Sequence, residues 1–588
     1  MKIDKKIILA STGLLFVGTA MAQVQQKDST LTRTVVVENQ YNPEVMDAFK
    51  VNVLPKVEEP AVAKKHIDYA TGQSPLIRFG FEPMGVMTRN VQQAGARRGY
   101  VRGSYGMVNH TDVKASYLWD LSKSNQLGVM GSFYGHSGDV PAAMLNDETD
   151  ESQRFFRGDF GLDYSHAFDK VKLNLGVNFA NQVFGYQYDY AEYGLPGDES
   201  IPDGSGVPRV SNNQHFMMGN GYVGLSSVKG QTPVDFDVTL GFDAFKRKKS
   251  SFGVSDYMEM LPDYLQKMIF AKGAISGELS EESRVGIGFG VSHVMYNDDD
   301  YSFPAENPKS VEPFENQTLI QLNPYYAIQT ENLNVRLGAH VDIQTKVGSG
   351  LKVAPDLRAA YSFSDSYVLY LQALGGTTLN DFNRLNEVSP YWNSQRQIKT
   401  TYTVFDAQAG FKASPVNGLG LKLYGGYRLT KDDVFVLPSS IFQGVYVDVA
   451  DLQQDKSKVF YVGAGLSYDY RDALSFSLKG QYNNWKMGNK DNISYLLLKP
   501  EYTINADVNF MIYHGLRGLV TYQYEARKKV AGERQNAVNF LRLGAEKQLM
   551  DRLTVFVHAN NVLDQNYYTE TGYPDLGINV VGGISLRF

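Results

Sequence analysis

The residues of this sequence that could do chemistry are short clusters of carboxylates and aromatic side chains. The stretch Tyr296–Tyr301, YNDDDY, places three adjacent carboxylates between two tyrosines, so it could supply oxygen ligands to Ca²⁺. An acidic run at a loop tip is more commonly just solvated, and we favour that interpretation. The nine histidines have no HExxH-like spacing for zinc. Cysteine is absent, which excludes disulfides, thiolate metal sites and cysteine nucleophiles.

Two aromatic stretches are candidates for binding. Residues 184–204 interleave four tyrosines with acidic residues, and Ser389–Asn393 contains Tyr391 and Trp392. Tyrosine and tryptophan rings in external loops can stack on sugars or contact a protein at the cell surface. The same rings could instead belong to the outer aromatic girdle of a membrane protein. The sequence leaves both alternatives open.

Glycine-rich segments do not add a catalytic site. GIGFG at Gly286 and LGLKLYGG at Leu419 lie inside expected strands with no helix after them, so they do not resemble phosphate-binding loops. We predict no catalytic residue, no metal site and no cofactor, and therefore no enzymatic activity. The net charge of −6 gives no basic field for nucleic acid, and no nucleic-acid partner is expected.

The N-terminus has the pattern of an export signal. Lys2, Lys5 and Lys6 precede an apolar core from Ile7 to Ala20, and Ala20-Met21-Ala22 is a small-x-small cleavage site. The alternative, a membrane anchor, needs a longer apolar run. We expect residues 1–22 to be removed, and the absence of cysteine after the apolar core argues against a lipoprotein.

From residue 98 onward, apolar and polar residues alternate. In RFFRGDFGLDYSH, for example, Phe156, Phe160 and Leu162 lie on one face of a strand, opposite the polar residues between them. Such segments reach ten residues or more, which is longer than most strands of soluble sheets. We count about 22 of them. An even number of long alternating strands is typical of a transmembrane antiparallel β-barrel.

The connections between these strands fall into two alternating classes. Short ones are expected at 168–170, 280–283, 330–332, 364–366, 470–473 and 550–552. Long ones are expected at 189–208, 246–265, 297–316, 378–397 and 435–456. Short periplasmic turns and long external loops are the rule for outer-membrane barrels. NHTD at Asn109 is irregular, being a short connection where the alternation predicts an external one.

Charged residues on the polar face of the strands are expected to line the lumen. Arginine or lysine facing lipid at mid-membrane would cost roughly 2–4 kcal/mol. The predicted lumen-facing charges are Arg157, Asp159, Asp163, Lys479, Glu501, Asp507, Arg517, Arg542 and Glu546. A lumen of 22 strands is too wide for side chains alone to fill, so something must fill or gate it.

The C-terminus carries a specific resemblance. The last part of the chain reads as a hairpin that ends in an alternating strand with Phe588 as its final residue. Its characteristic residues are Asn561, Val562, Leu563, Asp564 and Tyr567, followed by Gly572-Tyr573-Pro574. It resembles the C-terminus of TonB-dependent outer-membrane receptors, a family of 22-stranded barrels. PDLGIN stands where that family usually has Pro-Gly-Arg. We expect the last strand to close the barrel near residues 99–107, and Phe588 to act as a signal for the outer-membrane assembly machinery.

The segment before the barrel departs from that family, whose members carry a plug domain of well over a hundred residues. Residues 23–97 form a short, mostly extended periplasmic segment or reduced plug, and residues 98–588 form the barrel. The stretch Thr34, Val35, Val36 and Val37 is similar to the box that pairs with TonB by strand addition. The alternative is a plain strand in a periplasmic tail.

Two functions follow from these observations. The first is ligand uptake across the bacterial outer membrane by a receptor-like barrel embedded in lipid, with TonB as partner. The second is a plugless barrel that acts as scaffold for a surface or periplasmic partner protein, or as a passive pore. The ligand and the oligomeric state are not encoded in any motif of the sequence.

Overall fold

The computed structural model describes the chain from Arg98 to the C-terminus with gaps. The described residues are 98–140, 151–189, 213–228, 230–248, 250–252, 259–261, 265–297, 314–348, 350–364, 366–392, 397–442, 446–471, 473–530, 536–570 and 573–588. Residues 1–97 lie outside this part, and so do the predicted signal peptide and the predicted N-terminal segment.

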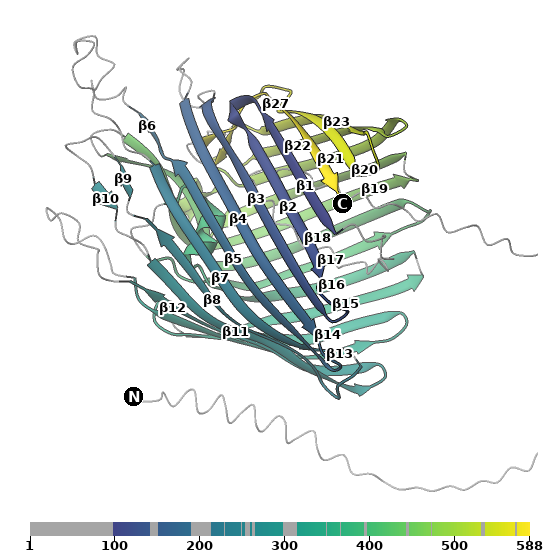
Figure 1. The fold of residues 1–588 in the computed structure, drawn as a ribbon. Helices are drawn as coiled ribbons and strands as arrows, with labels where there is room; N and C mark the ends of the chain where they lie inside the picture. Colours follow the sequence, from purple (N-terminus) through teal and green to yellow (C-terminus); the bar gives the residue numbers. More distant parts are fainter. Residues whose placement is uncertain are drawn as a thin grey trace, which may run out of the picture. The chain divides into compact units, whose positions relative to one another are not determined.

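Twenty-two antiparallel strands form the wall of a barrel (Figure 1). The first half consists of β1 (Gly99–Gly106), β2 (Thr111–Asp120), β3 (Asn125–Val140), β4 (Glu151–Ala167), β5 (Val171–Gly185), β7 (Asn213–Ser227), β8 (Asp235–Arg247), β11 (Leu265–Ser280), β12 (Ser283–Tyr296), β13 (Gln317–Gln329) and β14 (Leu333–Gln344). The second half consists of β15 (Gly350–Ser364), β16 (Tyr367–Thr378), β17 (Thr401–Ala413), β18 (Leu419–Phe442), β19 (Tyr446–Tyr470), β20 (Leu474–Met487), β21 (Pro500–Tyr513), β22 (Leu516–Arg527), β23 (Val538–Gln548), β24 (Leu553–Asn560) and β27 (Asn579–Arg587).

Smaller elements lie outside this wall. They are the strands β6 (Gln187–Asp189), β9 (Ser250–Phe252), β10 (Glu259–Leu261), β25 (Tyr568–Glu570) and β26 (Tyr573–Pro574), the helix α2 (Phe382–Val388) and the 3₁₀ helices η1 (Met107–Asn109) and η2 (Lys490–Leu496). Among the described residues, no helix is long and apolar enough to cross a membrane.

The first and last strands close the barrel. Tyr100 lies opposite Arg587 and Gly106 lies opposite Val581, so β1 and β27 pair along seven residues, as Figure 1 shows for the purple and yellow strands. Closure leaves no open edge in the wall, as a barrel in lipid requires. The predicted fold class, a transmembrane antiparallel barrel of about 22 strands, is confirmed.

The outer face of the wall is apolar. Val177, Leu240, Leu423 and Ile584 point away from the lumen and are each more than half exposed. Because side chains alternate along a strand, the residues between them face the lumen. An apolar outer band with a polar interior is the architecture of a bacterial outer-membrane protein, and the predicted localisation is confirmed.

Glycines and tyrosines pair across neighbouring strands. Gly410 lies directly opposite Tyr370, and a Cβ atom at Gly410 would collide with the Tyr370 ring. The same relationship joins Gly176 to Tyr222. An aromatic ring laid over a glycine protects the glycine backbone and helps to fix the register.

The connections follow the expected two classes with one exception. All six predicted short turns join two adjacent strands, and η1 occupies the short external connection at Asn109. The predicted loop at 435–456 is wrong, because β18 and β19 run through most of it as strands of 24 and 25 residues. VFVLP (residues 434–438) and YVDVA (residues 446–450) lie within these strands, and length alone did not distinguish a long hairpin from a loop.

Candidate functional site

The lumen face of the wall changes from polar to aromatic near the external end. Along β5 the lumen-facing positions are Asn178, Ala180, Gln182 and finally Phe184. Phe184 is fully buried, as are Phe216 at the corresponding end of β7 and Phe245 of β8. These three rings pack edge to face or tilted against one another, with centroids 5.1 and 5.2 Å apart for the neighbouring pairs.

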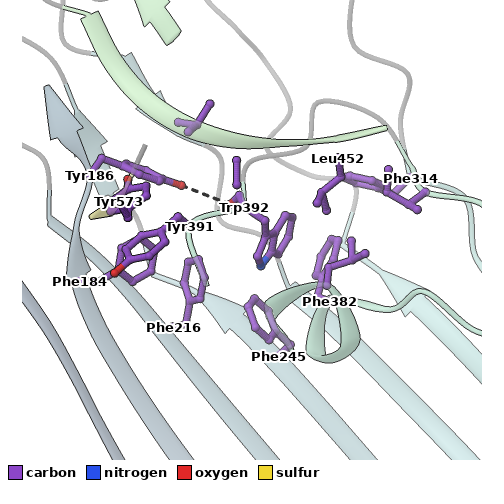
Figure 2. Packing of buried hydrophobic residues seen from close by; sticks show 14 of the residues in the cluster. Phe184, Tyr186, Phe216, Phe245, Phe314, Phe382, Tyr391, Trp392, Leu452 and Tyr573 are labelled. Carbon is purple, nitrogen blue, oxygen red and sulfur yellow. Dashed lines mark hydrogen bonds between the residues drawn. The ribbon is translucent and has the colours of Figure 1, made fainter. Parts of the chain in front are cut away.

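The connection between β16 and β17 packs against these rings inside the barrel (Figure 2). Phe382 and Leu385 of α2 are 2% exposed, and Tyr391 and Trp392 are fully buried. The Phe382 and Trp392 rings are 5.3 Å apart, and each also contacts Phe245. A loop that joins β16 to β17 therefore reaches the wall formed by β5, β7 and β8.

Paired amides hold α2 to the wall. Asn386 and Gln182 exchange two hydrogen bonds of 3.1 Å, each side-chain amide donating to the carbonyl oxygen of the other. Gln266 accepts from the backbone N–H of Phe382 at 2.7 Å and donates to the Asp381 carboxylate at 3.0 Å. Asp381 also caps α2 by accepting from the N–H of Arg384. Burial raises the pKa of the Asp381 carboxyl despite these donors.

Arg247 is a buried cation within the aromatic cluster. Its guanidinium lies 5.0 Å from the Phe216 ring centroid and 5.6 Å from that of Trp392. It donates to the Tyr186 hydroxyl at 2.8 Å, and Tyr186 in turn donates to the carbonyl oxygen of Trp392 at 3.3 Å. Arg247 is 1% exposed, so these cation–π contacts and hydrogen bonds form away from water, where they are strongest.

The β18–β19 hairpin crosses to the same cluster. Tyr446, Val447 and Asp448 of β19 pair with β6, which follows β5 on the other side of the barrel. Val449, Ala450 and Leu452 are buried in the cluster, and Ala450 forms a bridge with Trp392. We call the assembly of residues 379–392, β6 and residues 446–452 the cap.

The C-terminal hairpin supplies a fourth contact to the cap. The Tyr573 ring is stacked on Tyr391 at 3.4 Å between centroids, and its hydroxyl accepts from the N–H of Gln187. Its loop is organised by Asn561, which is fully buried and donates to the Asp575 carboxylate at 3.0 Å. The motif that carries the family resemblance thus forms a turn that positions Tyr573 against the cap.

A cavity of about 860 Å³ lies on the membrane side of the cap. Its wall contributes Arg157, Asp159, Asn220 and Asp243, and α2 contributes polar residues that include Arg384. Hydrogen-bonding groups and charges of both signs face this space beside apolar side chains such as Met218, Met268 and Leu379, so it can hold a solute with both polar and apolar parts. Among the described residues, no group of three or more His, Cys, Asp or Glu side chains is arranged to hold a metal ion.

The nine predicted lumen charges are distributed over five strands and do not form one cluster. Arg157 pairs with Asp159 at 3.0 Å, and Tyr222 donates to Asp163 at 2.6 Å. Asp507 accepts from Thr521 at 3.0 Å. The remaining predicted charges lie in β20 to β23: Lys479, Glu501, Arg517, Arg542 and Glu546.

Three other predicted features have different outcomes. Thr34 to Val37 and Asp298 to Asp300 lie outside the described residues. Phe588 lies at the closing seam, where its ring stacks on Tyr117 with centroids 5.8 Å apart, and its role in assembly stays a prediction. The glycine-rich segments at Gly286 and Leu419 lie within β12 and β18.

Sequence reasoning missed the cap. Tyr391 and Trp392 were expected to face a ligand or the lipid headgroups, and both alternatives are wrong because the two rings are fully buried inside the barrel. The signal was the change of the lumen face from polar to aromatic at Phe184, Phe216 and Phe245. These phenylalanines need apolar partners in the lumen, and among the described residues the connecting loops supply them.

The fold defines an outer-membrane barrel of 22 strands, and comparisons with solved structures agree. The chain is similar to the ferric enterobactin receptor of Pseudomonas aeruginosa, with 13% identity, 84% of this chain and 82% of that chain covered, and a TM-score of 0.61. It is similar to the FrpB iron transporter of Neisseria meningitidis, with 11% identity, 84% and 81% covered, and a TM-score of 0.60. The siderophore receptor PirA of Pseudomonas aeruginosa gives 12% identity, 84% and 80% covered, and a TM-score of 0.56.

These similarities establish the fold. The expected resemblance to TonB-dependent outer-membrane receptors is confirmed at that level. No protein-family model matches the sequence, and no curated protein matches it.

Proposed function

We propose that this protein is an outer-membrane receptor that takes up a small ligand into the periplasm. The observation that carries the proposal is the cap across the lumen of a 22-strand barrel. A passive pore gains nothing from a buried aromatic obstruction, whereas a receptor needs a closed state between transport events. The cap is built from three separated parts of the chain and is contacted by a fourth, the C-terminal hairpin, so it is a specific structure of this fold.

Similar structures indicate the class of ligand. Their names include a ferric enterobactin receptor, an iron transporter and a siderophore receptor. We therefore propose a chelated iron complex as the ligand and TonB as the source of energy, with Thr34 to Val37 as the contact for TonB. The cavity beneath the cap would receive the ligand after the cap moves.

Uptake of radioactive iron tests the proposal. A strain lacking the gene should lose uptake of at least one ferric siderophore from a panel, and the full-length gene should restore it. Deleting residues 34–37 should abolish restored uptake while leaving the barrel folded, as judged by heat resistance on a gel. A strain that takes up the whole panel without this gene would contradict the iron ligand.

Gentle purification from the membrane separates this function from a scaffold. A stoichiometric partner protein, together with unchanged iron uptake in the deletion strain, would support the scaffold. A barrel purified alone, from cells whose uptake depends on residues 34–37, supports the receptor.

A further inference from the structure

Two lysines face each other on the outer face of the wall. Lys458 of β19 lies directly opposite Lys486 of β20. Their neighbours Val459 and Trp485 are buried inside the barrel, so the alternation of side chains points both lysines away from the lumen. Like charges at directly opposed positions repel each other and destabilise a sheet, so a charge of opposite sign is expected near the pair.

The pair lies at the edge of the apolar band of the wall. Lys486 lies about 12 residues beyond Leu474, where β20 begins after its periplasmic turn. At about 3.4 Å per residue, this distance is roughly 40 Å along the strand. A strand tilt of about 35–45° converts it to a height of roughly 29–33 Å, compared with about 25 Å for the apolar band of such barrels. The two ammonium groups therefore lie at the level of the lipid headgroups of the outer leaflet.

The wall below the pair is apolar and aromatic. Phe460 follows Lys458 on the same face of β19 and is 49% exposed. Tyr482 precedes Lys486 on the same face of β20, and its ring centroid lies 4.9 Å from that of Tyr502 on β21. Tyrosine rings are typical of the boundary between hydrocarbon and headgroups, since one end is apolar and the other is polar. An acyl chain can therefore lie on this surface while its headgroup reaches the lysines.

A third lysine adds to the positive charge. Lys456 precedes Lys458 by two residues on β19 and lies on the same face. It extends the pairing of β19 with β20, since the N–H of Gly488 donates to the carbonyl oxygen of Lys456 at 2.6 Å. Gly488 has no side chain to cover this lysine. Three ammonium groups are thus carried by adjacent positions of two strands.

The fold supplies no counter-charge to these lysines. Within the described part of the chain, no Asp or Glu side chain lies within the 4.0 Å of an ion pair from any of the three. Asp455 is adjacent to Lys456 in sequence, but its carboxylate accepts from the N–H of Asn489 at 3.2 Å and from the side-chain amide of Asn492 at 3.0 Å. This carboxylate therefore holds the turn after β20.

An opposed pair on the lumen side shows the contrast. Arg336 of β14 lies directly opposite Arg358 of β15. The Asp356 carboxylate lies 2.8 Å from Nε of Arg336 and 3.3 Å from Nε of Arg358, and its side chain is 2% exposed. The arginine pair thus carries its own anion within the fold. The lysine pair faces the membrane, which can supply an anion in the form of a lipid phosphate.

We propose that Lys456, Lys458 and Lys486 bind the phosphate group of an anionic lipid in the outer leaflet, with the acyl chains of that lipid on the apolar wall below. Lysine ammonium groups bind phosphate oxygens as point charges, and several of them can share one phosphate. A membrane lipid fits better than a soluble anion, because the site is continuous with the lipid-facing surface. The proposal does not rest on the proposed uptake function, since it concerns only the outer face of the wall.

Native mass spectrometry of the full-length protein, purified in detergent and stripped of co-purified lipid, tests the site with diphosphoryl lipid A as the probe. The K458Q/K486Q protein should bind this lipid at least fivefold more weakly than the wild type, and K458R/K486R should bind it within twofold. The control K123Q/K170Q removes two exposed lysines from the β2–β3 and β4–β5 turns and should also stay within twofold of the wild type. Wild-type binding should weaken as ammonium acetate rises, because salt screens the attraction.

Thermal unfolding separates a binding role from a structural one. Without lipid, K458Q/K486Q should unfold at the same temperature as the wild type or a higher one, since the substitution removes a repulsion. With lipid A present, the wild type should gain stability and K458Q/K486Q should gain less. Heat resistance on a gel establishes that each variant is folded before titration.

Four results would overturn the proposal. They are equal binding of lipid A by K458Q/K486Q and the wild type, equal losses in K458Q/K486Q and K123Q/K170Q, binding of dephosphorylated lipid A as tight as that of the diphosphoryl form, and binding of sodium phosphate as tight as that of the lipid. The third result would show that the phosphate is not recognised, and the fourth would show a site for soluble anions.

Discussion

The guanidinium of Arg247 lies 5.6 Å from the ring centroid of Trp392. This contact joins the end of β8 in the wall to the loop that crosses the lumen. Removing this ring should release the loop. Truncating a buried tryptophan typically lowers stability by about 3–5 kcal/mol. Here the loss should weaken the packing of the cap against the wall, because the wall strands keep their hydrogen bonds. We expect Trp392→Ala to raise single-channel conductance in planar bilayers several-fold at unchanged heat resistance. Trp119→Ala, on the outer face, is the control, and equal conductance in Trp392→Ala and wild type would contradict this account of the cap.

Pairing between β6 and β19 should act as a latch. Gln187 and Asp448 lie directly opposite each other, and the chain has no cysteine, so Q187C/D448C would introduce a single disulfide across the mouth. We expect the oxidised protein to lose ligand uptake and the reduced protein to recover it. The control L437C/D451C joins β18 to β19 within the hairpin and should leave uptake unchanged. Full uptake by the oxidised Q187C/D448C protein would mean that the cap moves without breaking this pairing.

The loop that carries Tyr573 should depend on pH through Asp575. Burial raises the pKa of the Asp575 carboxyl to about 6, although Tyr567 and Asn561 bond to it. Because the folded pKa is raised, the stabilising contribution is complete below the ordinary pKa near 4 and is lost as pH rises through about 6. The full effect is on the order of 2–3 kcal/mol at about 1.4 kcal/mol per unit. Amide hydrogen exchange in residues 561–578 should be faster at pH 7.5 than at pH 4.5 after correction for intrinsic rates, and Asp575→Asn should abolish the difference.

Glycine beneath an aromatic ring should be required at Gly410. A β-branched side chain there would displace the Tyr370 ring, and overpacking typically costs about 1–3 kcal/mol. We expect Gly410→Val to lower the temperature at which the barrel unfolds on a heat-shift gel. Gly219→Val is the matched control, since no atom lies within 4 Å of a Cβ atom at that position. Equal losses in both variants would indicate a general intolerance of valine in the wall.

Phe588 should matter for assembly more than for transport. Its ring covers Gly99 and stacks on Tyr117 at the closing seam. Phe588→Asp places a charge in this aromatic contact and removes the terminal aromatic residue. We expect its level in the outer membrane to fall sharply, with degradation in the periplasm, while Phe588→Tyr stays near the wild-type level. Normal accumulation of Phe588→Asp in immunoblots of outer membranes would reject the assembly signal.

The wall of the barrel could be predicted from the sequence because one rule determines it. In a strand between lipid and water, the type of each residue depends on the side that it faces. The apolar Phe160 therefore indicates the lipid side and the charged Asp159 indicates the lumen side. The cap follows no local sequence pattern of this kind. Trp392 is buried by Phe216 and Phe245, which lie roughly 150–180 residues earlier in the chain, and its own neighbours in sequence are those of an ordinary exposed loop.

The origin of the cap has a consequence for the cell envelope. Every side chain of the aromatic cluster belongs to residues 155–573, within the same chain that forms the wall. The cap therefore enters the membrane together with the barrel, as part of the same chain. A newly inserted copy therefore contains its cap as soon as its strands have closed.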